Sequence, residues 1–264
     1  MKYTLASIWA YRYFIISSIQ TEFRSKFARS KFGGLWMIFH PLAQVLIYAL
    51  VLSAVLKAKL SGIDSQYAYA IYLMAGMVAW NLFMDITSRS LNVFIDNGNL
   101  IQKMSFPKLT LPLIVIGSSL TNFAFLFFAM IVVFGFLGHF TSVVILWIPI
   151  LMLITVILAI GIGLTLGILN VFIRDIGQIM TIIFQFWFWL TPIVYSKSMI
   201  PEEYQNLLLF NPMSGIVEGY HSVLVYDKMP NLELLIYPSI LAITTLGLGL
   251  FLYKKSNKEM ADLL

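Results

Sequence analysis

Residues 184–195 read FQFWFWLTPIVY, and residues 201–212 read PEEYQNLLLFNP. The first stretch places six aromatic rings within twelve residues, more than a plain membrane anchor requires. The second stretch begins and ends near proline, yet it contains the apolar run 207–210, which an ordinary loop outside a membrane does not need. Together they predict a helix that lines a wide path, followed by short segments that dip back into a membrane. This pattern is typical of a transporter.

The composition of the whole chain supports a membrane location. Of its 264 residues, 60% are hydrophobic and 11% are charged, whereas soluble domains have roughly 25% charged residues. The first apolar run begins only after about thirty residues rich in Lys and Arg, so we expect no cleavable signal sequence. With no cysteine, the chain has no disulfide, thiolate metal site or cysteine nucleophile.

Six apolar runs are long enough to cross a hydrocarbon core of roughly 30 Å at 1.5 Å per residue. They are 35–56, 67–84, 111–137, 143–169, 178–195 and 233–253. The sequence therefore predicts an all-α polytopic membrane protein with six transmembrane helices. We expect one domain over 1–264, with an N-terminal segment at 1–31, a membrane domain at 35–253 and a tail at 254–264.

The Lys and Arg residues predict the orientation of these spans. With the N-terminus inside, the inner segments hold all of them except Lys57, Lys59, Lys197 and Lys228. Positive charge accumulates on the cytoplasmic side of membrane proteins, so both termini are expected in the cytoplasm. The net charge of +5 then reflects membrane topology and attraction to the inner leaflet, and no nucleic-acid partner is expected.

Residues 1–31 are interrupted by charges and do not read as a span. At 100° per residue an apolar stripe shares one face of a helix, and polar residues lie elsewhere. The stripe comprises Leu5, Ile8, Trp9, Ile16, Ile19, Phe23 and Phe27, and the polar set Thr21, Glu22, Arg24, Ser25 and Arg29. Two compatible interpretations remain, a helix in the cytoplasmic interface and a collar packed on the membrane domain.

Several features mark the inner segments. Residues 85–110 form the longest predicted inner loop, where one or two helical turns near Leu100–Met104 suit either a docking knob or a plain connector. His40, beside Pro41, lines the pathway or is a satisfied packing residue. The fourth span ends in small residues that permit close helix approach, namely Gly161, Gly163 and Gly167. The following inner turn contains Arg174 and Asp175, a candidate ion pair.

The outer segment after the fifth span contains a second group of candidate residues. Thr191-Pro192 predicts a kink or stop at the outer face. Two short helices are expected at 201–209 and 213–226. On the second of them, Glu218 and His221 are three residues apart and are candidates to pair across one turn.

Motifs for catalysis are missing from the sequence. No G-x-x-x-x-G-K-[ST] occurs, so the chain does not cradle ATP with a P-loop. The three histidines at 40, 139 and 221 are too dispersed for a metal cluster, and neither D-x-D nor H-x-x-x-x-D occurs. Acidic residues fall mostly in predicted loops, which argues against a proton relay. We therefore expect neither an enzyme nor a proton-driven carrier, and no cofactor or metal in this chain.

Three stretches together resemble the membrane subunits of ABC-type polysaccharide exporters, the family that serves O-antigen, group 2 capsule and teichoic acid export. The first runs from RSKFGGLW at 29–36 to HPL at 40–42 and IY at 47–48. The second has AGM at 75–77 with Trp80, then NGNLIQK at 97–103, FPK at 106–108 and LPL at 111–113. The third has LNV at 169–171, RD at 174–175, WLTPI at 189–193, IPE at 200–202 and NP at 211–212. Their order and spacing cover nearly the whole chain.

The resemblance implies a twelve-helix pore made by two copies of the chain in a bacterial inner membrane. Two separate ATPase subunits, which hold ATP and Mg, would dock on the cytoplasmic loops and drive export of a lipid-linked polysaccharide. The 92–106 stretch corresponds to the coupling helix and 201–226 to the outer gate. The implied channel-lining rings are Trp36, Phe39, Tyr48, Phe184, Trp187, Phe188 and Tyr195; gate residues Pro201, Glu202, Asn211, Pro212, Glu218 and His221; coupling residues Asn97, Leu100, Lys103, Met104, Phe106 and Pro107; and inner-turn residues Arg174 and Asp175.

Flat aromatic rings suit a sliding sugar chain because they offer apolar faces without fixing its register. The competing interpretation is that most of these rings face lipid. Other functions also remain: a permease for small lipids or drugs, a membrane glycosyltransferase or acyltransferase, and a membrane scaffold. Among polymers, O-antigen is preferred over capsule because 200–226 and the amphipathic N-terminus resemble that branch most closely.

Overall fold

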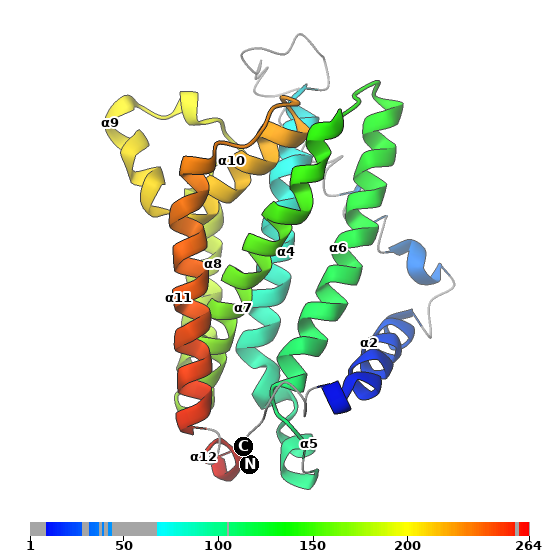
Figure 1. Cartoon of the computed structure of the whole chain (residues 1–264), viewed down its shortest axis with the longest axis vertical. Coiled ribbons are helices and arrows are strands. Elements are labelled where there is room, and N and C mark those ends of the chain that lie inside the picture. Colours follow the sequence, from blue (N-terminus) through cyan, green and yellow to red (C-terminus); the bar gives the residue numbers. More distant parts are fainter. Residues whose placement is uncertain are drawn as a thin grey trace.

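The computed structural model describes residues 9–27, 32–36, 39, 42–43, 68–104, 106–256 and 259–263. These residues form helices and turns, with no β-strand among them (Figure 1). In chain order the elements are α2 (Arg12–Phe27), η1 (Gly33–Leu35), α4 (Ala68–Asp96), α5 (Gly98–Lys103), α6 (Thr110–Phe136), η2 (Val143–Trp147), α7 (Ile148–Phe172), α8 (Asp175–Leu190), η3 (Lys197–Met199), α9 (Glu202–Gln205), η4 (Asn206–Phe210), α10 (Pro212–Leu224), α11 (Leu232–Ser256) and α12 (Glu259–Leu263).

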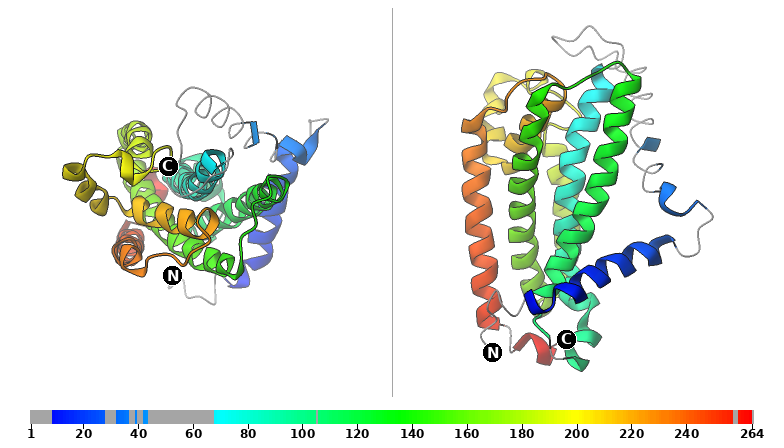
Figure 2. Two further views of the ribbon diagram at one scale, coloured as in Figure 1. Left: turned by 90° about the horizontal axis from the view of Figure 1, so that it is seen from above. Right: turned by 45° about the vertical axis from the view of Figure 1, so that its right-hand side comes forward.

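Helix α4 is the central element of the bundle. Its 29 residues extend about 44 Å at 1.5 Å per residue. It packs against α6, α7, α8 and α10, and most of its side chains are buried. In the view from above, α4 lies among these helices while α11 lies at the edge beyond α7 (Figure 2). The first half of α4, which is largely apolar on all sides, is suited to this interior position.

Glycines on α7 set its spacing to the neighbouring helices. A Cβ added at Gly163 would lie 2.6 Å from Ser90 Cβ of α4, and one at Gly167 would meet the Ser90 carbonyl oxygen. A Cβ at Gly161 would meet Thr245 and Leu246 of α11. The predicted close approach at Gly161, Gly163 and Gly167 is confirmed. Any side chain larger than that of glycine at these positions would collide with α4 or α11.

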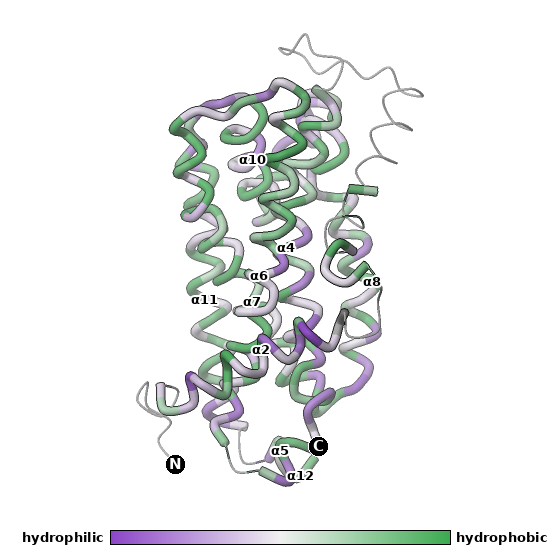
Figure 3. The backbone as a smooth tube through the Cα atoms, turned by 90° about the vertical axis from the view of Figure 1, so that its right-hand side faces the viewer, coloured by the Kyte–Doolittle hydropathy of each residue, from purple (hydrophilic) through white to green (hydrophobic). Residues whose placement is uncertain are grey.

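Four described helices are long and apolar enough to cross a membrane: Ala68–Asp96, Thr110–Phe136, Val143–Phe172 (η2 with α7) and Leu232–Ser256. Hydrophobic colouring covers most of α7 and α11, and hydrophilic patches occur at the end where α5 and α12 lie (Figure 3). The fifth predicted span corresponds to α8, which has 16 residues. Most of the first predicted span, 35–56, lies outside the described residues, as does His40.

Two predicted boundaries are wrong. Residues 85–96 belong to α4 and not to an inner loop. In this part of α4, Arg89 pairs with Glu22 of α2 and Asp85 accepts a hydrogen bond from Asn122 of α6. Helix α8 covers 175–190 and not 178–195. It ends where Thr191 precedes Pro192, as the Thr-Pro stop predicts, since a residue before proline disfavours helical backbone.

Helix α2 runs across the bundle near the end where α5 and α12 lie (Figures 1 and 2). It packs on α6, where Ile19 fills the space that a Cβ at Gly117 would need. Phe23 and Phe125 bring their ring centroids to 5.6 Å. The described part of the predicted 1–31 helix is therefore packed on the chain's own helices, as the collar interpretation expects.

Candidate functional site

The aromatic helix α8 has two different faces. One face packs on α4: Phe184 is 3% exposed, and the ring centroid of Trp187 lies 5.1 Å from that of Phe83. On the other side, Phe186 and Trp189 are 67% and 63% exposed. Their spacing of three residues places both rings on the same side of the helix. This exposed aromatic face is available to a ligand or to another protein surface.

The difference between the two faces of α8 means that one of the predicted channel-lining rings, Phe184, is not exposed. Phe184 fills the interior of the chain, so it has no surface to offer to a path in this arrangement. Trp187 and Phe188 are half-buried, with the Phe188 ring 5.6 Å from Trp80. Phe186 and Trp189, which were not among the predicted rings, are the ones that α8 exposes. Sequence reasoning missed this because it counted rings without projecting them on the helix.

Asn211 joins the end of α8 to the start of α10. Its Oδ1 accepts hydrogen bonds from Trp187 Nε1 at 2.8 Å and from the Met213 backbone nitrogen at 3.0 Å. Its Nδ2 donates to the Leu190 carbonyl oxygen at 3.2 Å and to Thr191 Oγ1 at 3.0 Å. The bond to Met213 is an N-cap, and Pro212 occupies the first helical position, where its missing N–H costs nothing. Asn211 thus fixes how the aromatic helix meets the helices at the end of the bundle opposite α5, where outer denotes that end and inner the end at α5.

His221 binds α10 to the outer part of α4. Its ring stacks on Tyr72 with centroids 3.7 Å apart and planes inclined by 21°. His221 Nε2 lies 3.1 Å from the Tyr72 carbonyl oxygen, and the side chain is fully buried. Gly76 provides the space, because a Cβ there would lie 2.9 Å from Nε2. Burial lowers the pKa of His221 to about 3, so the ring is neutral at physiological pH.

Two tyrosines of α4 hold the segment that follows α8. Tyr69 Oη donates to the Val194 carbonyl oxygen at 2.6 Å. Tyr72 Oη lies 3.1 Å from the Tyr195 carbonyl oxygen and 3.3 Å from that of Pro192. Tyr195 is half-buried, and its own hydroxyl donates to the Trp189 carbonyl oxygen at 2.9 Å. The outer third of α4 therefore contacts both the end of α8 and helix α10.

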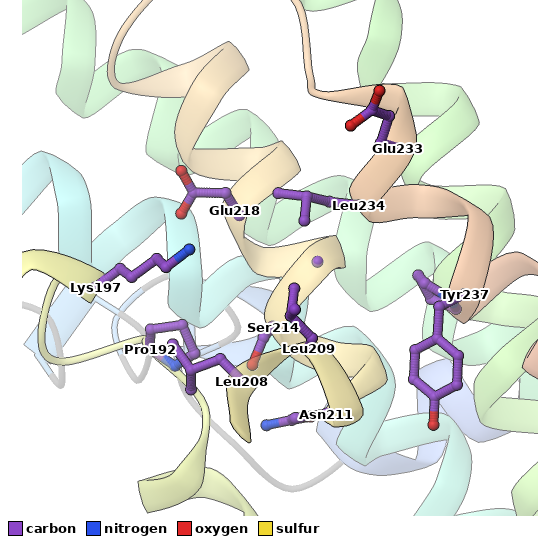
Figure 4. Close-up of a pocket in the computed structure, with 12 residues that line it drawn as sticks. Pro192, Lys197, Leu208, Leu209, Asn211, Ser214, Glu218, Glu233, Leu234 and Tyr237 are labelled. Atoms are coloured by element: carbon purple, nitrogen blue, oxygen red, sulfur yellow. The ribbon is translucent and has the colours of Figure 1, made fainter. Parts of the chain in front are cut away.

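A cavity of about 230 Å³ lies between η4, α10 and α11. Leu208, Leu209 and Leu234 supply apolar walls, and Lys197 and Glu218 supply opposite charges (Figure 4). The carboxylate of Glu218 and the ammonium of Lys197 point toward one another in this view. Burial raises the pKa of Glu218 above its usual range, and Lys197 partly opposes that shift.

The predicted pairing of Glu218 with His221 is wrong. No hydrogen bond or salt bridge joins these two described residues. His221 is inside, against α4, whereas Glu218 lines the cavity. The suggested ion pair between Arg174 and Asp175 is also not formed. Both side chains are exposed, and water competes for them there. Asp175 instead occupies the first turn of α8, where the helix dipole favours an acid.

The other predicted gate residues differ in exposure. Pro201 and Glu202 are exposed at the start of α9, whereas Pro212 is buried at the start of α10. The expected short helices are present as α9 with η4, over 202–210, and as α10, over 212–224. They lie beside α11 at the end of the bundle opposite α5 (Figure 1).

The first-span rings are only partly described. Trp36 and Phe39 are 50% and 47% exposed, and their centroids lie 6.4 Å apart in an edge-to-face arrangement. Tyr48 lies outside the described residues.

At the opposite end of the bundle, α5 forms the short helix expected after the Asn97-Gly98 turn. Lys103 and Met104 are exposed there, and Asn97 and Leu100 are half-buried. Phe106 and Pro107 are buried, and the Phe106 ring lies 6.0 Å from Phe14 of α2. Only part of the predicted coupling stretch is therefore accessible to another protein in this arrangement.

A charged cluster at the junction of α2, α4 and α6 was not predicted. Arg89 Nη2 lies 2.8 Å from both carboxylate oxygens of Glu22, and Ser118 Oγ donates to Glu22 Oε2 at 2.8 Å. Asp85 is 4.0 Å from Arg89 Nη1 and accepts from Asn122. One signal was present in the sequence: Glu22 is the only acidic residue before Asp64. Its position among the polar residues of the N-terminal segment does not by itself indicate a partner on α4.

Asn170 forms a second unpredicted contact, at the turn between α7 and α8. It is buried, and its Nδ2 donates to the Leu91 carbonyl oxygen at 3.1 Å. Its Oδ1 accepts from the Gly177 backbone nitrogen at 2.9 Å. This amide therefore fixes the first turn of α8 on α4.

Comparison with known proteins finds relatives along nearly the whole chain. Residues 13–225 match the family described as "ABC-2 type transporter". The chain is 28% identical over 268 residues to an O-antigen export system permease protein of Klebsiella pneumoniae, covering 100% of this chain and 98% of that protein. It is 23% identical over 257 residues to a protein of the same description from Myxococcus xanthus, covering 97% and 96%. A polysialic acid transport protein of Escherichia coli is 22% identical over 240 residues, covering 90% and 92%.

The family match covers most of the chain, including α2, the central helix α4, the aromatic helix α8 and the outer helix α10. The chain is thus a membrane protein of the ABC-2 type transporter family.

Proposed function

We propose that this chain is the membrane subunit of an ATP-driven exporter of lipid-linked polysaccharide, with O-antigen as its polymer class. The observation that carries the proposal is the exposed aromatic face of α8, which ends at helices fixed by Asn211. Rings offer apolar faces to the C–H faces of sugars, and their contacts do not require a single register. The full-length similarity to O-antigen export permeases supports this substrate class.

Capsular polysaccharide is the second candidate. It is favoured by the similarity to a polysialic acid transport protein, over slightly less of the chain.

In the proposed assembly, two copies of the chain form the pore, each with six spans. Four spans correspond to described helices, α8 supplies the fifth and residues 35–56 the first. The exposed face of α8 would then meet the path or the second copy, because a single chain leaves it uncovered. Trp36 and Phe39, which are also half exposed, are candidates for the same surface.

The proposed orientation places α5 and both termini on the cytoplasmic side of a bacterial inner membrane. It is supported by the positive charge of the inner segments and by the position of α2, α5 and α12 at one end of the bundle (Figure 1). Two ATPase subunits would dock on α5, where Lys103 and Met104 are exposed, and would hold ATP and Mg. This chain itself would carry no cofactor.

The arrangement suggests how docking at α5 could bias the outer helices. A single helix, α4, connects α5 to Tyr72 and His221, so a displacement at one end is carried by a continuous element. Moving a two-state equilibrium from 1:99 to 99:1 needs roughly 5.5 kcal/mol of differential binding. In this scheme, ATP-driven closure of the ATPase subunits supplies that difference.

The test is the location of the glycan in cells that lack this chain. The proposal expects full-length, lipid-linked polymer on the cytoplasmic side and none at the surface. Truncated or absent polymer would indicate a role in synthesis, and normal surface polymer would exclude polysaccharide as the substrate.

Complementation with variants then tests the aromatic face. We expect the double change Phe186→Ala and Trp189→Ala to reduce surface polymer at least several-fold with normal membrane insertion. Ile179→Ala, an exposed aliphatic control on the same helix, should leave export near the wild-type level. Full export by the double variant would contradict the role of the rings.

A further inference from the structure

The cavity beside α10 contains a charge whose surroundings are incomplete. Glu218 is half-buried and lines the cavity, yet no described residue forms a hydrogen bond or salt bridge with its carboxylate. Lys197 is the opposite charge that acts on it, from the exposed rim. A carboxylate partly removed from water without a close partner is unfavourable. A bound cationic group would relieve that cost.

The size and walls of the cavity suit a small polar group with an apolar extension. Its volume of about 230 Å³ is large enough for a group of several non-hydrogen atoms. Leu208, Leu234 and Pro238 form apolar walls, and the ring of Tyr237 lies at the edge. An apolar lining with a few placed charges is typical of a small-molecule site.

Exposed apolar side chains also form a row on α11, on a different side of the helix from the cavity-lining Glu233, Leu234 and Tyr237. Leu232, Ile236 and Ile240 are each 57% exposed, and their spacing of four residues places them in one row. Ile243 continues the exposed surface at 68%. Because α11 is a candidate membrane span and the cavity includes its first two turns, the cavity opens at headgroup level beside acyl chains. Phospholipids of the membrane are therefore the molecules that surround this site.

We propose that the cavity binds the headgroup of a phospholipid with a primary ammonium, of the phosphatidylethanolamine class. The ammonium donates to Glu218, the phosphate lies at Lys197, and the acyl chains extend into the membrane around α11. The opposite charges of the protein thus match the opposite charges of one zwitterionic headgroup. This site is independent of the exported substrate and goes beyond the proposed function.

The same geometry disfavours other lipid headgroups. A quaternary ammonium, as in phosphatidylcholine, cannot donate a hydrogen bond to the carboxylate. Phosphatidylglycerol brings only negative charge to a site that contains Glu218, with Glu233 also in its lining.

Native mass spectrometry of the purified full-length chain tests the proposal. The chain is incubated with equimolar dioleoyl phosphatidylethanolamine, phosphatidylcholine and phosphatidylglycerol, and the adducts are counted. Wild type should retain the ethanolamine lipid in preference to the choline lipid, and Glu218→Gln should reduce that preference about tenfold, which equals about 1.4 kcal/mol. Glu203→Gln removes an exposed carboxylate outside the cavity and should leave the preference unchanged.

Lys197→Gln supplies a second readout that does not depend on the folding of the Glu218 variant. Lys197 is exposed, and the phosphate is common to both zwitterionic lipids. This variant should weaken retention of both lipids several-fold and leave their ratio unchanged.

Three outcomes would overturn the proposal. They are an equal preference in wild type and Glu218→Gln, a preference for phosphatidylglycerol, and displacement of the lipid by a soluble oligosaccharide. The last outcome would indicate that the cavity takes sugar. Surface polymer measured in the same variants keeps the two proposals separate, since loss of lipid preference with normal export contradicts neither of them.

Discussion

The two ends of α4 are joined to the rest of the chain by different chemistry. At the outer end, Tyr72 and His221 stack in a fully buried contact, and Tyr69 and Tyr72 bond backbone carbonyls of the segment after α8. At the inner end, Arg89 pairs with Glu22, and their side chains are 26% and 25% exposed. The outer junction is neutral and dry, whereas the inner junction is charged and partly wet.

This difference predicts different mechanical behaviour. Buried rings are as closely packed as the rest of a protein interior. Removing or adding even one methylene-sized group there therefore lowers the free energy of unfolding. An ion pair near water exchanges its partners at small cost and weakens with salt. We expect the outer junction to move as a unit with α10. The inner junction is better suited to let α2 shift on α4.

The largest test of this comparison is His221→Ala. Losing a fully buried ring against Tyr72 should lower the free energy of unfolding by about 2–4 kcal/mol, because a cavity remains. Denaturation of the purified chain in mixed micelles measures it. Tyr72→Phe keeps the ring and removes only the hydroxyl bonds, so it should cost about 1 kcal/mol. Equal effects of the two variants would show that the stacked ring is not the main contribution.

Acidification provides the second test. Between an unfolded pKa near 6.5 and the folded value of about 3, the unfolded state binds a proton at His221 that the folded state does not. Stability contributed by neutral His221 is therefore lost as pH falls, by about 2 kcal/mol from pH 7.5 to pH 5.

Glu218 acts in the opposite direction. Its pKa is raised by burial, so the ionised carboxylate lowers the stability of the folded state at neutral pH. This destabilisation disappears as pH falls and the carboxylate is protonated. The measurement is accordingly the difference between wild type and His221→Phe, which keeps Glu218. If both unfold with the same pH dependence between pH 7.5 and pH 5, titration of His221 does not control the outer junction.

The inner junction should give a smaller, salt-dependent effect. In a double-mutant cycle with Glu22→Gln and Arg89→Gln, we expect a coupling of about 1 kcal/mol at low salt, and less at high salt. Unfolding of the four proteins in mixed micelles at two salt concentrations measures it. Arg24→Gln, an exposed change on α2, is the matched control and should show no coupling to Glu22. A coupling that is large and independent of salt would place the pair with the dry outer junction.

The smallest effect is expected at the turn between α7 and α8. Arg174 is exposed and forms no salt bridge with another described residue, so Arg174→Ala should change the free energy of unfolding by less than about 0.5 kcal/mol. Asn170→Ala, at the same turn, should cost more than Arg174→Ala, because it removes the acceptor of the Gly177 N–H in the first turn of α8. Similar losses in a thermal unfolding assay would contradict the assignment of Asn170 as the residue that fixes the turn.

Sequence patterns predicted much of the outer region, as single elements and not as contacts. The Thr191-Pro192 stop and the helices near 201–209 and 213–226 follow from local chemistry, since proline and capping residues act on their own neighbours. The position of Glu218 and His221 on one turn was also correct, yet their pairing was not. Three residues along a helix bring side chains near each other only when neither is recruited by another element.

The sequence by itself determined that this is an all-helical membrane chain and where most of its described spans lie, because apolar length is a local property. It also determined the stop of α8 at Thr191-Pro192, since proline acts on its own neighbours. Only the tertiary structure decided which rings of α8 are buried and that α4 continues through 85–96. It also paired Glu22 with Arg89 and His221 with Tyr72. These outcomes depend on neighbours distant in the chain, since burial and pairing are set by whichever surface packs opposite.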